Sequence, residues 1–196
     1  RRFSCIAAQG AADAERFRAL GVDAARIVVT GSIKFDVQPP ASLTDRAEVL
    51  RRTWGNDRPV WVAASTREGE DEQVLAAHAL VRADLPTALL VLVPRHPERF
   101  ERVAALVHRA GFVLARRSLH EPCPADVAVY LGDSMGELTV FFAAADVAFV
   151  GGSLVPTGGH NLLEPAAAGL PVLAGPHTFN FAAITRLLRE RGALTQ

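Results

Sequence analysis

The chain of 196 residues is poor in cysteine and has no excess of charge of either sign. Its two cysteines, Cys5 and Cys123, lie far apart and in no spacing typical of a metal site or a redox pair, so we expect reduced thiols in a cytosolic protein. Because 21 basic residues balance 21 acidic ones, we do not expect a broad surface that binds nucleic acid. We expect any basic side chain with a role in function to act at a single binding site and not as part of a broad basic surface.

Several motifs are absent as well. No apolar run approaches the ~18 residues of a transmembrane helix, and no signal peptide is present. The chain begins "RRFSCIAAQ" without methionine, so we expect it to be a piece of a longer protein. There is no GxGxxG, no GxxxxGK[ST] and no paired-aspartate metal motif. These absences argue against a dinucleotide dehydrogenase, a P-loop NTPase and a metal-dependent site.

The chain consists instead of short apolar runs that alternate with helical periodicity. The apolar runs predict strands at 4–8, 27–29, 60–64, 88–93, 127–131, 147–150 and 172–173. The helical periodicity predicts helices at 11–20, 44–53, 71–83, 97–110, 136–144, 162–168 and 181–191. Repeated strand–helix units with continuously apolar strands predict an α/β fold, a Rossmann-like doubly wound parallel sheet. We expect one domain over residues 1–196, with an internal linker at 37–45.

Such sheets bind ligands beyond the carboxyl ends of their strands, where the helices begin. Three stretches there contain a helix-capping residue with a glutamate three positions later: Ser65 and Glu68, Ser134 and Glu137, Asn161 and Glu164. Helix capping alone explains the first two pairs well. It does not explain the four glycines of "GGSLVPTGGHNLLEP" around the third, which favour a ligand close to the main chain. Free amides favour an anion and carboxylates favour sugar hydroxyls, which together indicate a nucleotide or a nucleotide sugar.

Two further stretches carry cationic groups. Arg95 and His96 follow the predicted strand at 88–93 and lie between two prolines that fix the backbone. An arginine there suits a phosphate or a carboxylate, although a structural histidine is as good an explanation for His96. Lys34 in "VTGSIKFD" is explained more simply as a surface lysine beside a turn.

The succession "VTGSIKFD", "AASTREGE", "VPRHPERF", "GDSMGEL" and "FVGGSLVPTGGHNLLEPAAAGLPVLAGPHTFNF" resembles the C-terminal half of Kdo transferases, the 3-deoxy-D-manno-octulosonic acid transferases of lipopolysaccharide synthesis. The resemblance covers nearly the whole chain. It implies the C-terminal domain of a GT-B glycosyltransferase that moves Kdo from CMP-Kdo to lipid A precursor, without cofactor, metal or nucleic acid. The N-terminal acceptor domain, with its acidic catalytic base, would be absent here.

The resemblance therefore implies no catalytic residue in this chain, which would bind CMP or CMP-Kdo without turnover. It implies a parent protein at the cytoplasmic face of the bacterial inner membrane, attached through other parts, and a fragment that is itself soluble. Arg95, with Ser65 and the helix start at Thr66, matches the phosphate contact, and Glu164 is the best match for the ribose hydroxyls. The whole set implied for the donor is Lys34, Ser65, Thr66, Arg95, His96, Ser134, Met135, Gly136, Glu137, Gly158, Gly159, His160, Asn161 and Glu164.

The chain departs from the family pattern in places. Arg67 stands where the family commonly has histidine, so a role for that histidine does not carry over, and Leu162 replaces a proline. Two alternatives remain open from the residues alone. One is another GT-B enzyme that uses a UDP-sugar, and the other is a non-catalytic binding module in which the capping pairs are purely structural.

Overall fold

The computed structural model describes residues 3–31 and 42–196. We expected one domain over residues 1–196, but the chain divides into two compact units, Arg1–Gln38 and Pro39–Gln196. The boundary falls inside the predicted linker at 37–45, most of which lies outside the described residues. The two units are described separately below.

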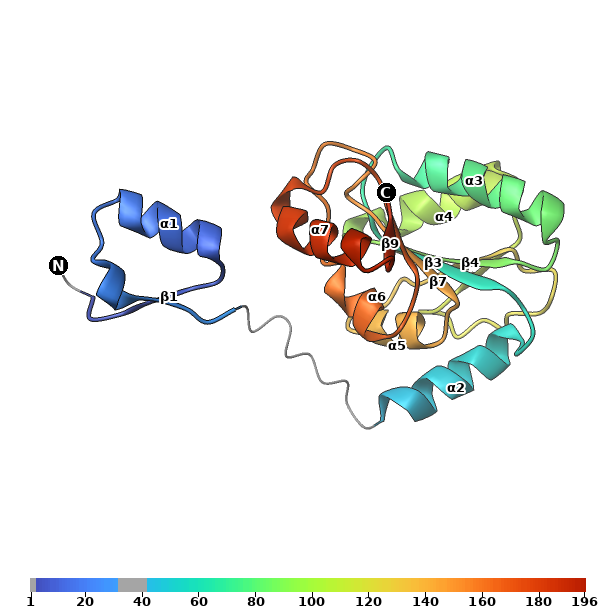
Figure 1. Ribbon diagram of the computed structural model, residues 1–196. Helices are drawn as coiled ribbons and strands as arrows, with labels where there is room; N and C mark the ends of the chain where they lie inside the picture. The colour runs from blue at the N-terminus through green and yellow to red at the C-terminus, as the bar shows by residue number, and fades with distance from the viewer. Residues whose placement is uncertain (1–2, 32–41) are drawn as a thin grey trace. The chain divides into compact units, whose positions relative to one another are not determined.

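The first unit is a single strand–helix–strand motif (Figure 1). It consists of β1 (Ile6–Ala8), α1 (Ala11–Ala19), the 3₁₀ turn η1 (Ala24–Arg26) and β2 (Ile27–Val29). The two strands pair in parallel, with Ile6 opposite Ile27. Within the described part of this unit these strands form a two-stranded sheet, and Phe3 and Leu20 are 75% and 79% exposed. A parallel pair of this kind is normally covered on both faces, so the motif is typical of part of a larger sheet.

The described part of the second unit contains a seven-stranded parallel sheet. Its strands, in sequence order, are β3 (Val60–Thr66), β4 (Leu89–Pro94), β5 (Leu114–Arg116), β6 (Val129–Leu131), β7 (Val147–Val150), β8 (Val172–Ala174) and β9 (Leu194–Thr195). They are arranged in the order β5-β6-β4-β3-β7-β8-β9. All six residues of β4 are buried, as a strand covered on both faces should be.

Helices cover both faces of this sheet (Figure 1). They are α2 (Leu43–Trp54), α3 (Asp71–Asp84), α4 (Phe100–Arg109), α5 (Leu138–Ala143), α6 (Leu163–Ala167) and α7 (Ala182–Glu190), with 3₁₀ turns η3 (Pro97–Arg99) and η4 (Phe179–Phe181). Helices α3 and α4 pack with one face of the central strands, and α2 and α5 pack with the other. A third apolar cluster joins α6 and α7 to β7, β8 and β9. The predicted doubly wound α/β architecture is confirmed.

Each predicted strand and helix is present, with ends that differ by a few residues at most. Two strands, β5 and β9, were not predicted. They are three and two residues long, and β5 ends in an arginine, so neither produces the apolar run that identifies the central strands. Both lie at edges of the sheet, where the strand is not buried on all sides.

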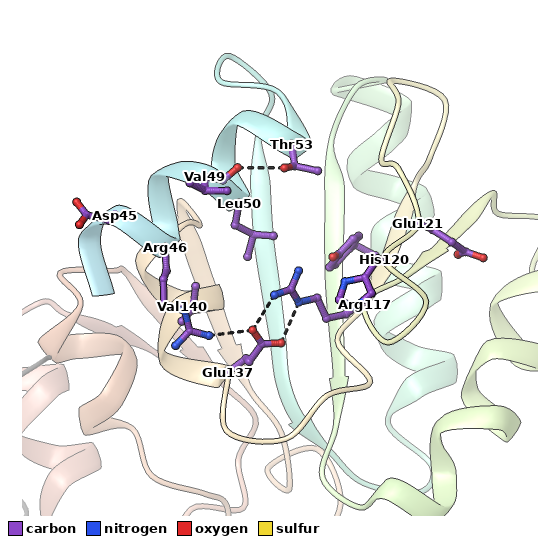
Figure 2. A pocket seen from close by; sticks show the side chains of 11 residues that line it. Asp45, Arg46, Val49, Leu50, Thr53, Arg117, His120, Glu121, Glu137 and Val140 are labelled. Atoms are coloured by element: carbon purple, nitrogen blue, oxygen red, sulfur yellow. Dashed lines mark hydrogen bonds and ion pairs between the residues drawn. The ribbon is translucent and has the colours of Figure 1, made fainter. Parts of the chain in front are cut away.

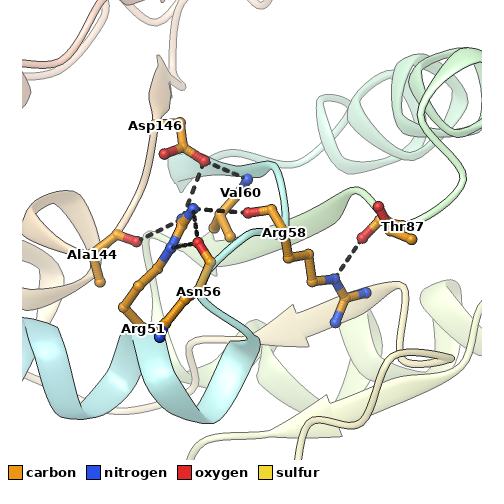
Figure 3. Close-up of polar contacts among 7 residues, drawn as sticks. All are labelled: Arg51, Asn56, Arg58, Val60, Thr87, Ala144 and Asp146. Atoms are coloured by element: carbon orange, nitrogen blue, oxygen red, sulfur yellow. Dashed lines mark hydrogen bonds and ion pairs between the residues drawn. The ribbon is translucent and has the colours of Figure 1, made fainter.

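At the amino end of the sheet, two arginines donate hydrogen bonds to backbone carbonyls (Figure 3). Arg51 of α2 donates to the carbonyls of Asn56, Arg58 and Ala144 at 3.1, 2.8 and 3.1 Å, and to the Asp146 carboxylate at 3.1 Å. Arg58 is 6% exposed and donates to the carbonyls of Thr87, Pro124 and Val127. These bonds fasten α2 and the incoming loops to the sheet.

Candidate functional site

The strand order of the sheet changes direction between β3 and β7. Strands β4, β5 and β6 lie on one side of β3, and β7, β8 and β9 lie on the other. From β3 the chain passes through α3 to β4 on one side, and from β6 it passes through α5 to β7 on the other. A crevice that binds ligands forms at such a position, beyond the carboxyl ends of the two strands. The residues that follow β3 and β7 are therefore the first place to look for a site.

The end of β3 is irregular at Ser65. The pairing of β3 with β4 shifts between Ala64 and Thr66, and Ser65 has a positive φ of 56°. A non-glycine residue in the left-handed region costs free energy and is held there by its surroundings, often at functional sites. The bulge places the half-buried Ser65 at the carboxyl edge of the sheet.

A buried carboxylate joins the loops after β3 and β7. Glu70 is 0% exposed. Its Oε2 accepts from the amides of Arg67 and Gly152 at 2.8 and 2.6 Å. Its Oε1 accepts from the amides of Ser153 and Leu154 at 3.0 and 2.8 Å. Four backbone donors stabilise the buried negative charge, and in return the carboxylate fixes the start of the glycine-rich loop.

The glycines of this loop allow close approach between chain segments. A Cβ atom at Gly151 would lie 2.8 Å from the Ser65 carbonyl oxygen and 2.9 Å from Glu70 Oε2. At Gly152, where φ is 67°, a Cβ atom would lie 2.9 Å from Cδ2 of His160. Side chains at these positions would push the loop away from β3 and from the imidazole.

Arg67 connects this loop to the one after β4. Its Nε donates to Nε2 of His160 at 3.2 Å, and its Nη1 lies 3.0 Å from Nε2 of His96. Burial, followed by the charges of Arg67 and Arg95, lowers the pKa of His160 to about 4. His160 is therefore neutral near pH 7, and the positive charge here belongs to the arginines. We call Arg67, Glu70, Arg95, His96 and His160 the switch-point cluster.

Arg95 differs from its neighbours because its guanidinium is open to solvent. Its amide donates to the Thr66 carbonyl at 3.0 Å, which fixes its backbone beside β3. The residue is exposed, and among residues 3–31 and 42–196 no hydrogen bond or ion pair engages its side chain. A fixed backbone with an unengaged planar cation is suited to bind a phosphate or a carboxylate.

The expected helix cap formed by Ser65 and Glu68 is wrong. β3 continues to Thr66 and α3 begins only at Asp71, so Ser65 lies too far from the helix to cap it. Glu68 pairs with Arg102 on the surface at 2.7 Å. Thr66 is 0% exposed, and its hydroxyl donates to Asp71 at 2.7 Å. That hydroxyl is thus engaged inside the protein rather than presented to a ligand.

The pair Asn161 and Glu164 does organise the start of α6. The Asn161 side-chain oxygen accepts from the Leu163 amide at 3.1 Å, and its side-chain nitrogen donates to Glu164 Oε1 at 3.0 Å. In the described residues, the amides of Gly158, His160 and Asn161 donate to no backbone or side-chain acceptor. Within the described part of the chain, these three amides and Oε2 of Glu164 are therefore without a hydrogen-bond partner.

Ser134 and Glu137 form a different structure from the predicted cap. The Ser134 hydroxyl donates to Glu137 at 2.6 Å, and α5 begins at Leu138 with no side-chain cap. Arg117 donates twice to the same carboxylate at 2.9 and 2.8 Å, and Arg46 of α2 donates once at 2.9 Å (Figure 2). These bonds, those of Arg117 above all, lower the pKa of Glu137 to about 2.

We call Arg46, Arg117, Ser134 and Glu137 the Glu137 cluster. Three of the four line a cavity of about 430 Å³, together with apolar side chains such as Leu50 and Val140 (Figure 2). The residues lining that cavity are Asp45, Arg46, Val49, Leu50, Thr53, Arg117, His120, Glu121, Tyr130, Glu137 and Val140. The cluster holds the loop that carries Met135, which is 69% exposed, and Gly136, whose φ is 76°.

The structure thus divides the predicted site residues between two places. Ser65, Arg95, His96 and the loop from Gly158 to Glu164 lie at the carboxyl ends of β3, β4 and β7, whereas Met135, Gly136 and Glu137 follow β6. Among the described residues no hydrogen bond or ion pair links the two clusters. Lys34 lies outside the described residues.

Sequence reasoning did not include Arg67 and Glu70 among the site residues. The sequence does hold one indication for Arg67, its position three residues after the predicted strand at 60–64. For Glu70 there is none, because it stands in "EGEDE" among other acids and only the fold turns it inward. In the described ranges, no group of three or more His, Cys, Asp or Glu side chains could hold a metal ion. The same ranges include no helix long and apolar enough to cross a bilayer.

A family model and the similar curated proteins point to the same family. A family described as "3-Deoxy-D-manno-octulosonic-acid transferase (kdotransferase)" matches residues 1–37. The chain is 48% identical over 189 residues to a 3-deoxy-D-manno-octulosonic acid transferase of Haemophilus influenzae, covering 96% of this chain and 44% of that protein. It is 45% identical over 193 residues to the enzyme of the same name from Bordetella pertussis, with the same coverage of 96% and 44%. The chain therefore spans less than half the length of these relatives.

A solved structure is similar over most of its length. It is the C-terminal CMP-Kdo binding domain of WaaA from Acinetobacter baumannii, with 37% sequence identity and a TM-score of 0.75. The match covers 80% of this chain and 83% of that domain.

Proposed function

Because the chain belongs to the family of 3-deoxy-D-manno-octulosonic acid transferases, we propose that residues 39–196 bind the CMP part of CMP-Kdo as the donor domain of a GT-B glycosyltransferase. The observation that carries the proposal is that, among the described residues, the exposed Arg95 guanidinium and several amides of the glycine-rich loop have no partner, while both segments follow strands at the carboxyl edge of the sheet. The named ligand of the similar solved domain supports the identity of the nucleotide.

In this proposal Arg95 binds the phosphate of the donor, together with Ser65 and the amides of Gly158, His160 and Asn161. Glu164 uses Oε1 for Asn161, which leaves Oε2 for the ribose hydroxyls. Met135 and Gly136 lie against the base or the ribose. Glu137 is ionised and fully bonded, so it holds their loop in place rather than binding the ligand.

The chemistry of the leaving group fits these residues. A nucleoside monophosphate carries less charge than a diphosphate, and one arginine with several fixed amides is well placed to stabilise it as it departs. Removal of a proton from the acceptor hydroxyl requires a general base. We place that base in the remainder of the full-length protein, which would transfer Kdo to lipid A precursor at the cytoplasmic face of the bacterial inner membrane. Residues 3–31 would then belong to the sheet of the acceptor domain.

Calorimetric titration of the 196-residue chain with CMP, UMP, UDP and NAD tests the proposal. We expect CMP to bind more tightly than the other three, and CMP-Kdo to remain intact in the presence of the chain alone. Folded protein that does not bind CMP at millimolar concentration, or that prefers UDP, would contradict it.

A further inference from the structure

Arg67, a half-buried arginine in a loop, is bonded at three places. Its amide donates to Glu70, its Nε donates to His160, and its Nη1 contacts His96. The residue thus joins the loops that follow β3, β4 and β7. Nothing in the family pattern assigns this role, because this chain has arginine where the family commonly has histidine.

The contacts of Arg67 determine which imidazole nitrogens carry protons. A guanidinium has only N–H donors, so each histidine nitrogen that it contacts must be an acceptor. Nε2 of His160 and Nε2 of His96 are therefore the acceptors of these contacts, and the neutral ring of His160 carries its proton on Nδ1.

His78 provides an internal comparison. Trp61 Nε1 donates to Nδ1 of His78 at 3.1 Å, and Nε2 of His78 lies 2.8 Å from the Ala128 carbonyl oxygen. The proton of His78 must therefore be on Nε2, the opposite tautomer to that of His160. His78 and His160 thus each take the tautomer that the neighbouring N–H donor requires.

The free edge of the His160 ring faces away from Arg67. Gly152 packs against the Cδ2–Nε2 edge, so Nδ1 lies on the opposite side of the ring. Among the described residues no hydrogen bond engages Nδ1 of His160. The charged and titratable groups around this ring are Arg67, Arg95, Glu70 and His96.

We infer that Arg67 is a positioning residue that holds His160 as a neutral imidazole whose Nδ1–H donates to the anionic part of the nucleotide, with His96 anchoring the guanidinium. The identity of the anion rests on the proposed function, whereas the tautomers do not. Removing Arg67 would leave Nε2 of His160 free to take a proton, so that Nδ1–H would no longer be the fixed donor.

The first test is ¹⁵N NMR of the imidazole rings in the ligand-free 196-residue chain. We expect unprotonated Nε2 and protonated Nδ1 for His160 and His96, and the reverse for His78. In Arg67→Gln the fixed tautomer of His160 should become a mixture, and its protonation midpoint should rise above about 4 because the cation nearest to it is lost.

The second test is CMP affinity in a double-mutant cycle. We expect Arg67→Gln to weaken binding about tenfold, the cost of one lost charge-assisted contact. We expect no further loss when it is combined with His160→Gln, because both changes remove the same donor. Arg102→Gln, a matched change at the exposed Arg102–Glu68 pair, should leave the tautomers and the affinity unaltered.

Protonated Nε2 on His160 in the unaltered chain, or tautomers insensitive to Arg67→Gln, would overturn the inference. Losses of CMP affinity that add up in the double variant of Arg67→Gln and His160→Gln would overturn it as well. If the unaltered chain binds no CMP but shows the expected tautomers, the nucleotide assignment fails while the positioning role of Arg67 stands.

Discussion

The two ends of the parallel sheet use polar side chains in opposite ways. At the amino end, Arg51 and Arg58 donate to backbone carbonyls (Figure 3), whereas at the carboxyl end Glu70 accepts from backbone amides. At the amino end the acceptors are mostly carbonyls of the loops that lead into the strands. At the carboxyl end the donors to Glu70 are amides of the loops that follow β3 and β7.

The comparison also separates structural arginines from one available to a ligand. Arg58 and Arg95 both lie next to a strand and a proline, but Arg58 precedes its strand and Arg95 follows one. Arg58 is buried and saturated with protein acceptors, while Arg95 is exposed and unengaged among the described residues. Acceptors within the protein can bond every nitrogen of an arginine side chain, as they do for Arg58. An arginine therefore indicates a binding site when its side chain has no acceptor in the protein, and its residue type alone does not.

Arg58→Met should have the largest effect and should act on stability alone. It leaves the carbonyls of Thr87, Pro124 and Val127 without their donor, which should cost about 4 kcal/mol in the free energy of unfolding. Urea denaturation measures this, with Arg52→Met on the exposed side of α2 as the matched control. CMP affinity of the folded protein should not change. A loss below about 1 kcal/mol would contradict the structural role.

Glu70→Gln should affect both stability and ligand binding. An amide group cannot accept from four backbone donors, and its NH₂ would oppose at least one of them, at a cost of about 3 kcal/mol in unfolding free energy. Weaker CMP binding should accompany it because the glycine-rich loop loses its anchor. Glu68→Gln, two residues away and 70% exposed, is the control and should be silent. Equal effects of the two variants would be incompatible with the assigned roles.

Arg95→Met should weaken CMP binding and leave the stability of the fold nearly unchanged, which is the opposite of the effect expected for Arg58→Met. The melting temperature should stay within one or two degrees, while CMP affinity should fall by about 2 kcal/mol, or roughly thirtyfold. Arg109→Met, an exposed arginine at the end of α4, serves as the charge-matched control. If Arg95→Met binds CMP as tightly as the unaltered chain does, the Arg95 guanidinium does not contact the nucleotide.

The smallest expected effect concerns pH. Burial lowers the pKa of His78 to about 4, below that of the unfolded chain, so the unfolded state takes up the proton first as pH falls. Stability should therefore decrease between pH 7 and pH 5 by about 1–2 kcal/mol from this residue, and His78→Gln should reduce the slope. Urea denaturation at several pH values measures it. A slope that is the same in both proteins would contradict the neutral buried state of His78.

The fold was predictable because it depends on local patterns. Apolar runs identified β3, β4, β6, β7 and β8, and their alternation with helices identified the parallel sheet. Two errors about capping had one cause, since the spacing of Ser65 from Glu68, and of Ser134 from Glu137, resembles a helix start that the chain makes a few residues later.

The site was only partly predictable. Asn161, Glu164 and Arg95 stand in motifs, and the structure places them at the expected edge of the sheet. The bonds from Arg46 and Arg117 to Glu137 join residues 91 and 20 positions apart, and no local pattern encodes them. The inward turn of Glu70 depends in the same way on three amides of a loop more than 80 residues later.

The carboxylate of Glu70 has a consequence for the thermodynamics of ligand capture. It occupies the amides of residues 152–154 permanently, as a built-in anion, and so gives the loop its final shape during folding. The conformational entropy of that segment is therefore lost when the protein folds, and not when a ligand binds. A nucleotide that binds there, as proposed, would meet a loop whose first residues are already fixed, so less ordering of the chain would accompany its binding.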